Sequence, residues 1–117
     1  MRTLCRADDI REGEARGFRS VPPHGVFVVR RSGRLFVWRD ACPHYGDTPL
    51  AWRQHEYLNA ARDRIVCAAH GAQFEIDTGR CTLGPCLGDS LQAVAHAVTP
   101  DGWLTIEQDF SPQETQT

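Results

Sequence analysis

The sequence has no long apolar stretch, no clustered basic excess and no apolar leader. No nonpolar run approaches the roughly 18 residues of a membrane-spanning helix, and the first residues, from Met1 to Arg6, are mixed in character. The formal net charge is −2 with 24% charged residues, whereas a nucleic-acid-binding surface needs a local excess of positive charge. We therefore expect a cytoplasmic protein that binds neither membrane nor nucleic acid.

Internal repeats and low-complexity blocks are also absent. The 117 residues suffice for one modest hydrophobic core. The five cysteines are an odd number, which in a reducing compartment argues against a disulfide framework and for metal ligation or buried thiols. We expect a single domain over residues 1–117 and a monomer.

Two short stretches each combine one cysteine with one histidine. Cys42-Pro43-His44 has the spacing C-x-H and Cys67-Ala68-Ala69-His70 the spacing C-x-x-H, with 22 residues between the two stretches. Thiolate and imidazole ligands together suit soft or borderline metals. Two of each are compatible with a tetrahedral zinc site, or with a [2Fe–2S] cluster that has two cysteines on one iron and two histidines on the other.

The distribution of these ligands favours the cluster. A zinc site of this composition more often takes both cysteines from one loop and both histidines from another. Here each loop supplies one of each, in turns that end with Gly46 and Gly71, which suits a two-metal cluster held between two loops. A zinc-stabilised binding module is the alternative from another class.

The pair of motifs resembles the signature of the Rieske family, and the resemblance covers roughly Val26 to Gln108. Residues similar to those of Rieske ferredoxins follow the second motif: Gly71, Phe74, the turn Asp77-Thr78-Gly79, and Gly84-Pro85. The resemblance implies an all-β fold, a Rieske-like antiparallel β-sandwich. It also implies a small cluster-binding subdomain of two ligand loops at about residues 40–88.

The same resemblance implies a ligand set and a function. Cys42 and Cys67 are the expected ligands of the buried iron, and His44 and His70 those of the outer iron. Neutral imidazoles in place of two thiolates make such a cluster a better electron acceptor than an all-cysteine cluster. We expect an electron-transfer protein, not an enzyme, that carries one electron at a time from a ferredoxin reductase to an oxygenase or similar acceptor. A small auxiliary Rieske subunit of a reductase, such as nitrite reductase, is the alternative.

The resemblance is to the ferredoxin branch of the family. The respiratory branch has an extra cysteine in each ligand loop and a serine after the second His-Gly. Here Ala72 follows Gly71, and no further cysteine lies in either loop. Alanine has no hydroxyl to donate to a cluster sulfur, so we expect a reduction potential in the lower part of the Rieske range.

The pattern of nonpolar residues predicts short strands throughout. Two β-branched and aromatic runs, Val26 to Arg30 and Leu35 to Trp38, flank a turn and predict a hairpin. Further strands are expected over residues 63–66, 73–76, 91–98 and 103–107, and an edge strand and a loop within residues 1–20. Trp38 is expected to be a packed aromatic residue.

The stretch between the two motifs is longer than in many Rieske ferredoxins. Residues 48–62 include Trp52, His55 and Tyr57. We expect this stretch to be a surface excursion, with a partner-docking lobe as the alternative.

The remaining cysteines and histidines have simpler interpretations. Cys81 and Cys86 have the spacing C-x4-C, but no histidine or further cysteine stands nearby. We therefore expect two reduced, buried thiols and no second metal site. His24, His55 and His96 are not expected to be ligands.

Overall fold

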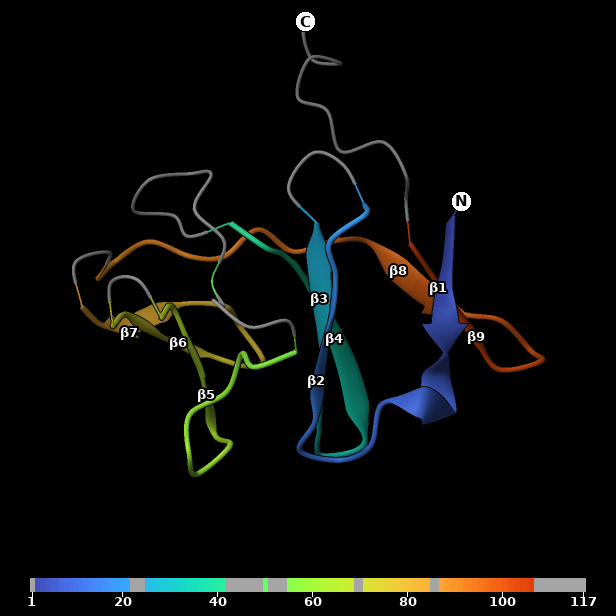
Figure 1. Ribbon diagram of the computed structural model, residues 1–117, viewed down its shortest axis with the longest axis horizontal. Helices are drawn as coiled ribbons and strands as arrows, with labels where there is room; N and C mark the ends of the chain where they lie inside the picture. The colour runs from blue at the N-terminus through green and yellow to red at the C-terminus, as the bar shows by residue number, and fades with distance from the viewer. Residues whose placement is uncertain are drawn as a thin grey trace, which may run out of the picture.

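The protein is built from β-strands. The computed structural model describes residues 2–21, 25–41, 50, 55–68, 71–84 and 87–106. These form three antiparallel sheets of three strands each (Figure 1), so the prediction of an all-β, antiparallel fold is confirmed. Within the described ranges the helical structure consists of one 3-10 turn, η1 (Ala7–Asp9). No helix there is long and apolar enough to span a membrane.

Two of the sheets contain strands that are consecutive in the sequence, whereas the other combines the first strand with the last two. The central sheet, in the order β2-β3-β4, contains β2 (Ala15–Phe18), β3 (Val26–Arg31) and β4 (Arg34–Arg39). The second sheet, in the order β1-β9-β8, contains β1 (Arg2–Arg6), β9 (Trp103–Ile106) and β8 (His96–Val98). The third sheet, in the order β5-β6-β7, contains β5 (Arg64–Val66), β6 (Gln73–Glu75) and β7 (Cys81–Leu83). The expected edge strand near the N-terminus is thus β1.

The predicted hairpin is β3–β4, and its register runs from Val26 opposite Arg39 to Arg31 opposite Arg34. Its two-residue turn has positive φ at both positions, 55° at Ser32 and 76° at Gly33. Such turns match the twist of the paired strands. The second strand of the hairpin, β4, ends at Arg39, just before the first cysteine motif.

Strand β3 is buried on both faces, because the central sheet lies between the other two sheets (Figure 1). Side chains alternate between the faces of a strand. One face contributes to the β5–β7 core, which consists of Phe27, Val29, Trp38, Leu50, Tyr57, Ile65, Cys67, Ala72, Phe74, Ile76, Cys81 and Leu91. The other contributes to the β1–β9 core, which consists of Cys5, Ile10, Val21, Val26, Val28, Val37, Val94, Leu104 and Ile106.

The strand predicted over residues 91–98 is shorter in the structure, where β8 begins at His96. The preceding segment runs from the third sheet to the second, across the end of β4 (Figure 1). It pairs with β4 through a single bridge between Trp38 and Ala93. Val94 is buried in the β1–β9 core while His96 is exposed.

The expectation of a surface excursion over residues 48–62 is wrong for two of its residues. Leu50 and Tyr57 are fully buried in the β5–β7 core. The Tyr57 ring stacks on Phe27, with ring centroids 4.3 Å apart and an interplanar angle of 6°. Stacked aromatic rings contribute about 0.5–1.5 kcal/mol beyond their buried area, so this stretch is anchored to the central sheet.

Candidate metal centre

The second cysteine motif begins where β5 ends. Cys67 directly follows β5 and is fully buried in the β5–β7 core. Ala68 and Gly71 are both exposed. Cys67 therefore lies in the core, while the described residues on either side of positions 69–70 lie at the protein surface. The other three predicted ligands, Cys42, His44 and His70, lie outside the described residues.

Backbone hydrogen bonds close this loop into a tight turn. The Cys67 carbonyl accepts from the Gly71 amide, and the Cys67 amide donates to the Ala72 carbonyl, each at 2.8 Å. Gly71 has φ of 71°, a left-handed conformation that costs little only for glycine. The glycine that ends the second motif is therefore a requirement of the turn.

Both residues next to Cys67 are tied to the stretch that precedes β5. The Val66 amide donates to the Tyr57 carbonyl at 2.8 Å, and the Ala68 amide donates to the Leu50 carbonyl at 2.7 Å. Leu50 and Tyr57 are themselves buried. The backbone on each side of the cysteine is thus held by residues from the stretch between the two motifs.

A third segment approaches the second loop at Gly84. A Cβ built on Gly84 would lie 2.7 Å from the Cα of Ala72, and its φ is 105°. Any side chain here would therefore collide with backbone as well as adopt a strained conformation. Gly84 lets the segment after β7 rest directly on the residue that follows the second motif.

A buried carboxylate, which was not predicted from the sequence, bonds to two residues that hold the backbone around Cys67. Asp40 is only 1% exposed. Its Oδ1 accepts from the Leu50 amide at 2.9 Å, and its Oδ2 accepts from the Tyr57 hydroxyl at 2.7 Å. The sequence offers one signal: an acidic residue at the end of a nonpolar strand, two positions before Cys42.

The buried contact between Asp40 and Tyr57 changes the pKa of the tyrosine hydroxyl. Burial raises the pKa of Tyr57 well above its usual value, and the hydrogen bond to Asp40 and the negative charge of Asp40 raise it further. Arg19 opposes the rise in part. The hydroxyl therefore stays protonated at any physiological pH and is a permanent donor to the carboxylate.

The other predicted cysteine and aromatic positions are structural. Cys81, in β7, is buried, and its Sγ lies 3.3 Å from the Leu83 carbonyl oxygen, which confirms the expected burial. Cys86 lies outside the described residues. Trp38 is 5% exposed and packs over Gly79, where a Cβ would come within 2.7 Å of its ring. The prediction of a packed aromatic residue is confirmed.

Two histidines that were not expected to be ligands are placed by the structure. His55 is exposed, with its Nδ1 accepting from the Gly17 amide at 2.9 Å. His96 is exposed, with its Nδ1 3.0 Å from the Val94 carbonyl oxygen. Across the described ranges no three histidine, cysteine or acidic side chains gather as a metal site would require. His24 lies outside those ranges.

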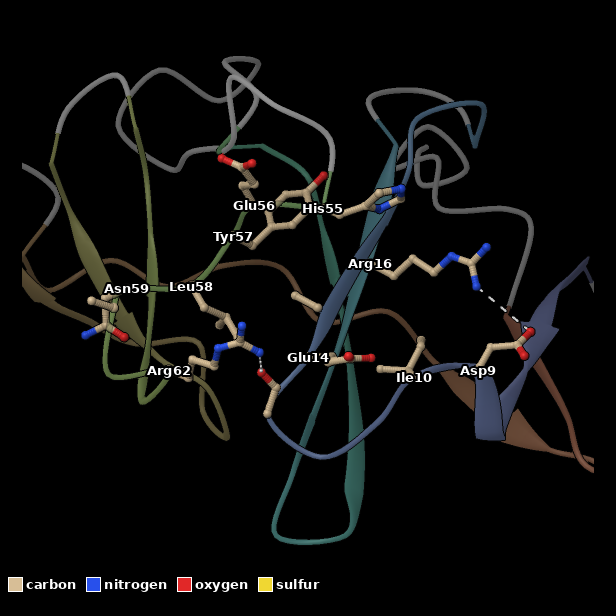
Figure 2. Close-up of a pocket in the computed structure, with 13 residues that line it drawn as sticks. Asp9, Ile10, Glu14, Arg16, His55, Glu56, Tyr57, Leu58, Asn59 and Arg62 are labelled. Atoms are coloured by element: carbon tan, nitrogen blue, oxygen red, sulfur yellow. Dashed lines mark hydrogen bonds and ion pairs between the residues drawn. The ribbon is translucent and has the colours of Figure 1, made fainter.

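A surface hollow lies between the β2 side of the central sheet and the segment 55–62 (Figure 2). The Arg62 guanidinium donates to the Gly13 carbonyl at 3.0 Å, and Arg16 lies 3.9 Å from a carboxylate oxygen of Asp9. Both acidic and basic side chains line it, and its two arginines have partners. The hollow therefore does not define a ligand of either charge.

Comparison with known families identifies the class of protein. The model of the Rieske [2Fe–2S] domain matches residues 1–98. The chain therefore belongs to the Rieske [2Fe–2S] domain family, which confirms the resemblance seen in the motifs. Its cofactor is a [2Fe–2S] cluster, and the zinc alternative is set aside.

Particular relatives are ferredoxins. The ferredoxin component of the p-cumate 2,3-dioxygenase system of Pseudomonas putida is 29% identical over 83 residues. That match covers 71% of this chain and 66% of the relative, so just under two thirds of the relative's length is spanned.

Among solved structures, the Sphingomonas yanoikuyae B1 ferredoxin has a TM-score of 0.69 at 25% identity, over 92% of this chain and 97% of that one. A chain from the complex of reduced oxygenase and oxidised ferredoxin in carbazole 1,9a-dioxygenase has the same TM-score and identity, over 90% of this chain and 99% of that one. The terminal oxygenase of carbazole 1,9a-dioxygenase from Nocardioides aromaticivorans IC177 shares the fold, with a TM-score of 0.72 at 20% identity, over 94% of this chain and 30% of that one.

The described residues fit such a cluster. Cys67 offers a thiol at the base of a turn, in a core that excludes water, as a ligand of the inner iron requires. The exposed Ala68 and Gly71 bracket the position of His70 in the sequence. Gly84 keeps the space beside Ala72 clear of side chain.

Proposed function

We propose that this chain is the ferredoxin component of an oxygenase system and carries single electrons from a reductase to a terminal oxygenase. The observation that carries the proposal is the Rieske match over residues 1–98. The Pseudomonas putida relative, a ferredoxin component of a dioxygenase system, supports it. So does the similarity to 97% of the Sphingomonas ferredoxin. We place the protein in the cytoplasm, as a monomer.

The proposed ligands are the four residues of the two motifs. Cys42 and Cys67 hold the inner iron, and His44 and His70 hold the outer iron, within a cluster-binding subdomain at about residues 40–88. Support comes from the contrast between the buried Cys67 and the exposed Ala68 and Gly71. When bound, the [2Fe–2S] cluster supplies one-electron oxidation and reduction.

The task of the chain is to hold the donors rigidly and keep water from the inner side of the site. The amides of Val66 and Ala68 fix the backbone around Cys67. Cys67 and Ala72 have no exposed surface. A donor set that barely moves between oxidation states keeps the reorganisation on electron transfer small. The exposed end of the second loop gives a partner protein access to the same site.

The ligand assignment is tested by comparing histidines. His44→Ala and His70→Ala are expected to yield protein with little iron or sulfide, because an iron loses a bond that the scaffold does not replace. The controls His55→Ala and His96→Ala remove exposed histidines that make ordinary backbone contacts and are expected to keep full iron content. Loss of iron from the His55 variant, with retention in the His44 variant, would refute the assignment.

The function is tested by reconstitution. The purified protein, reduced by a ferredoxin reductase, is mixed with terminal oxygenases of the cumate and carbazole dioxygenase types, and oxygenase reduction is followed by stopped-flow absorbance. We expect electron delivery by the wild type and none by the His70→Ala variant. A protein that reduces no such oxygenase but assembles stoichiometrically with a nitrite reductase would instead establish the auxiliary-subunit alternative.

A further inference from the structure

We infer that Asp40 is a positioning residue for the cluster, because its carboxylate fixes the backbone on both sides of the second cysteine ligand. The inference rests on the proposed ligands Cys42 and Cys67. Asp40 follows the end of β4 and stands two residues before Cys42. Asp40 therefore lies next to the first motif in the sequence, while its side chain bonds to residues that contact the backbone around the second motif.

The position of Asp40 is itself fixed by the central sheet. Its amide donates to the Gly25 carbonyl at 3.0 Å, which continues the pairing of the β3–β4 hairpin by one residue. The side chain is 1% exposed. Its two oxygens bond different residues, Oδ1 the Leu50 amide and Oδ2 the Tyr57 hydroxyl. A buried carboxylate is tolerated only when its oxygens have such donors.

Leu50 and Tyr57 each hold the backbone on one side of Cys67 by a hydrogen bond. The Leu50 carbonyl accepts the amide of Ala68, at 2.7 Å, and the Tyr57 carbonyl accepts the amide of Val66, at 2.8 Å. The network thus links one carboxylate, through Leu50 and Tyr57, to the two peptide groups that flank the cysteine. A shift of Asp40 or Tyr57 moves the backbone that carries the thiolate.

The packing around Tyr57 shows that the network has a single arrangement. The ring is stacked on Phe27 of β3. A Cβ on Gly17 of β2 would collide with the Tyr57 hydroxyl and ring. Only glycine at position 17 admits the tyrosine in the orientation that reaches Asp40. The hydroxyl therefore has little freedom to lose its bond to the carboxylate while the core stays packed.

The test uses the full chain with its cluster and four variants. Asp40→Ala removes both acceptors, while Asp40→Asn keeps an oxygen for the Leu50 amide but replaces the acceptor of the Tyr57 hydroxyl by an NH₂ donor. Tyr57→Phe removes one hydroxyl and keeps the ring. The control Val28→Ala lowers stability from the other face of β3, in the β1–β9 core. Iron release to a chelator, the EPR line shape of the reduced protein and the reduction potential are measured well below every melting temperature.

We expect Asp40→Ala to release iron at least tenfold faster than the wild type and to broaden the EPR signal. Asp40→Asn is expected to recover part of the slow release, because the acceptor of the Leu50 amide remains. Tyr57→Phe is expected to be intermediate in release rate, with a broadened signal and a shifted potential. Val28→Ala is expected to lower the melting temperature while the line shape and potential stay those of the wild type.

The inference is overturned if Tyr57→Phe and the Asp40 variants match Val28→Ala in line shape and potential. An asparagine variant as defective as the alanine variant also overturns it, since the acceptor kept for the Leu50 amide would then have no effect on the site. If Asp40→Ala does not fold, Tyr57→Phe and Asp40→Asn decide. The wild-type spectrum is recorded first. A wild type without a histidine-ligated [2Fe–2S] signal would refute the proposed function, whereas a normal wild type with unaltered variants refutes only the role of Asp40.

Discussion

The cores on the two faces of the central sheet are composed differently. The β1–β9 core is mostly aliphatic, with five valines, two isoleucines, one leucine and one cysteine. The β5–β7 core includes four aromatic side chains, two cysteines and an alanine, and the buried carboxylate of Asp40 bonds to its Tyr57. One face is thus packed with aliphatic side chains, and the other combines aromatic and small residues with polar atoms.

The difference follows from what each face has to position. Aliphatic side chains stabilise through the area that they bury and tolerate exchange for others of similar volume. Around Cys67 the backbone must come close to other backbone, as at Gly84 and Ala72, and hydrogen bonds must have one arrangement. We therefore expect substitutions in the β1–β9 core to affect stability and substitutions around Cys67 to affect the cluster.

The largest effect is expected from Gly84→Ala. The added Cβ would lie 2.7 Å from the Cα of Ala72, at φ of 105°. We expect a loss of about 4 kcal/mol in the free energy of unfolding, from strain and collision together, and most of the bound iron to be lost. Chemical denaturation and iron analysis measure the two effects.

Gly88→Ala is the matched control for this substitution. Gly88 has a similar φ of 95°, but nothing lies within 4 Å of a Cβ built there. It therefore carries the conformational strain without the collision, and we expect about 1–2 kcal/mol and full iron content. Equal losses of iron in the two variants would show that contact between Gly84 and Ala72 does not support the site.

Leu104→Ala tests the opposite face. Leu104 lies in β9, the middle strand of its sheet, and is fully buried in the β1–β9 core. Its truncation is expected to cost about 3 kcal/mol, or roughly 10 °C in melting temperature for a domain of this size. The reduction potential and EPR spectrum should be unchanged at low temperature. A changed spectrum would mean that the two cores are coupled through the central sheet.

The sequence predicted the elements well where a local pattern determines them. The β3–β4 hairpin follows from two nonpolar runs around Ser32-Gly33, and the turn at Asp77-Thr78-Gly79 from its composition. The Rieske signature in the two motifs predicted the cofactor, as the family match over residues 1–98 confirms.

What the sequence did not show depends on contacts between distant segments. Tyr57 stands among polar residues, and its burial depends on Phe27 and on the space left by Gly17. Asp40 is an ordinary surface residue by composition, and becomes a buried acceptor only because Leu50 and Tyr57 meet it. The pattern of residues within a single strand does not indicate such a contact between distant segments.

Ala72→Ser sharpens the comparison within the β5–β7 core. We expect the wild-type potential to lie nearer to about −150 mV than to +300 mV, because the fully buried Ala72 donates no hydroxyl hydrogen bond. A serine here is expected to raise it. A hydrogen bond of about 1 kcal/mol to a cluster sulfur corresponds to about 40 mV for one electron. Protein-film voltammetry measures the shift.

The control for this substitution is Ala68→Ser, in the same loop. Ala68 is exposed, so its hydroxyl would be solvated and the potential should stay within error of the wild type. A potential that rises equally in both variants would point to a general effect of polarity. A wild-type potential near the upper limit would mean that backbone amides already supply strong donors.

The smallest effect is expected at the end of the β3–β4 hairpin farthest from Asp40. The carboxylate of Glu12 accepts from the amides of Ser32 and Gly33, at 2.6 and 2.8 Å. The Gly33 bond, followed by the Ser32 bond, lowers the pKa of Glu12 below its usual 4.5. The ionised form is thus favoured by folding, so its contribution to stability is complete above pH 4.5 and is lost as the pH falls through the lowered pKa.

Glu12→Gln should therefore destabilise slightly at pH 7 and lose its effect in acid. Urea denaturation from pH 7 to pH 3 measures this, and the control is Glu56→Gln, at an exposed glutamate that lines the surface hollow. Because the turn is remote from Cys67, iron content should not change. A Glu12 variant whose stability deficit grows towards acid would show that the two amide bonds favour the protonated acid, contrary to the geometry of two N–H donors on one carboxylate.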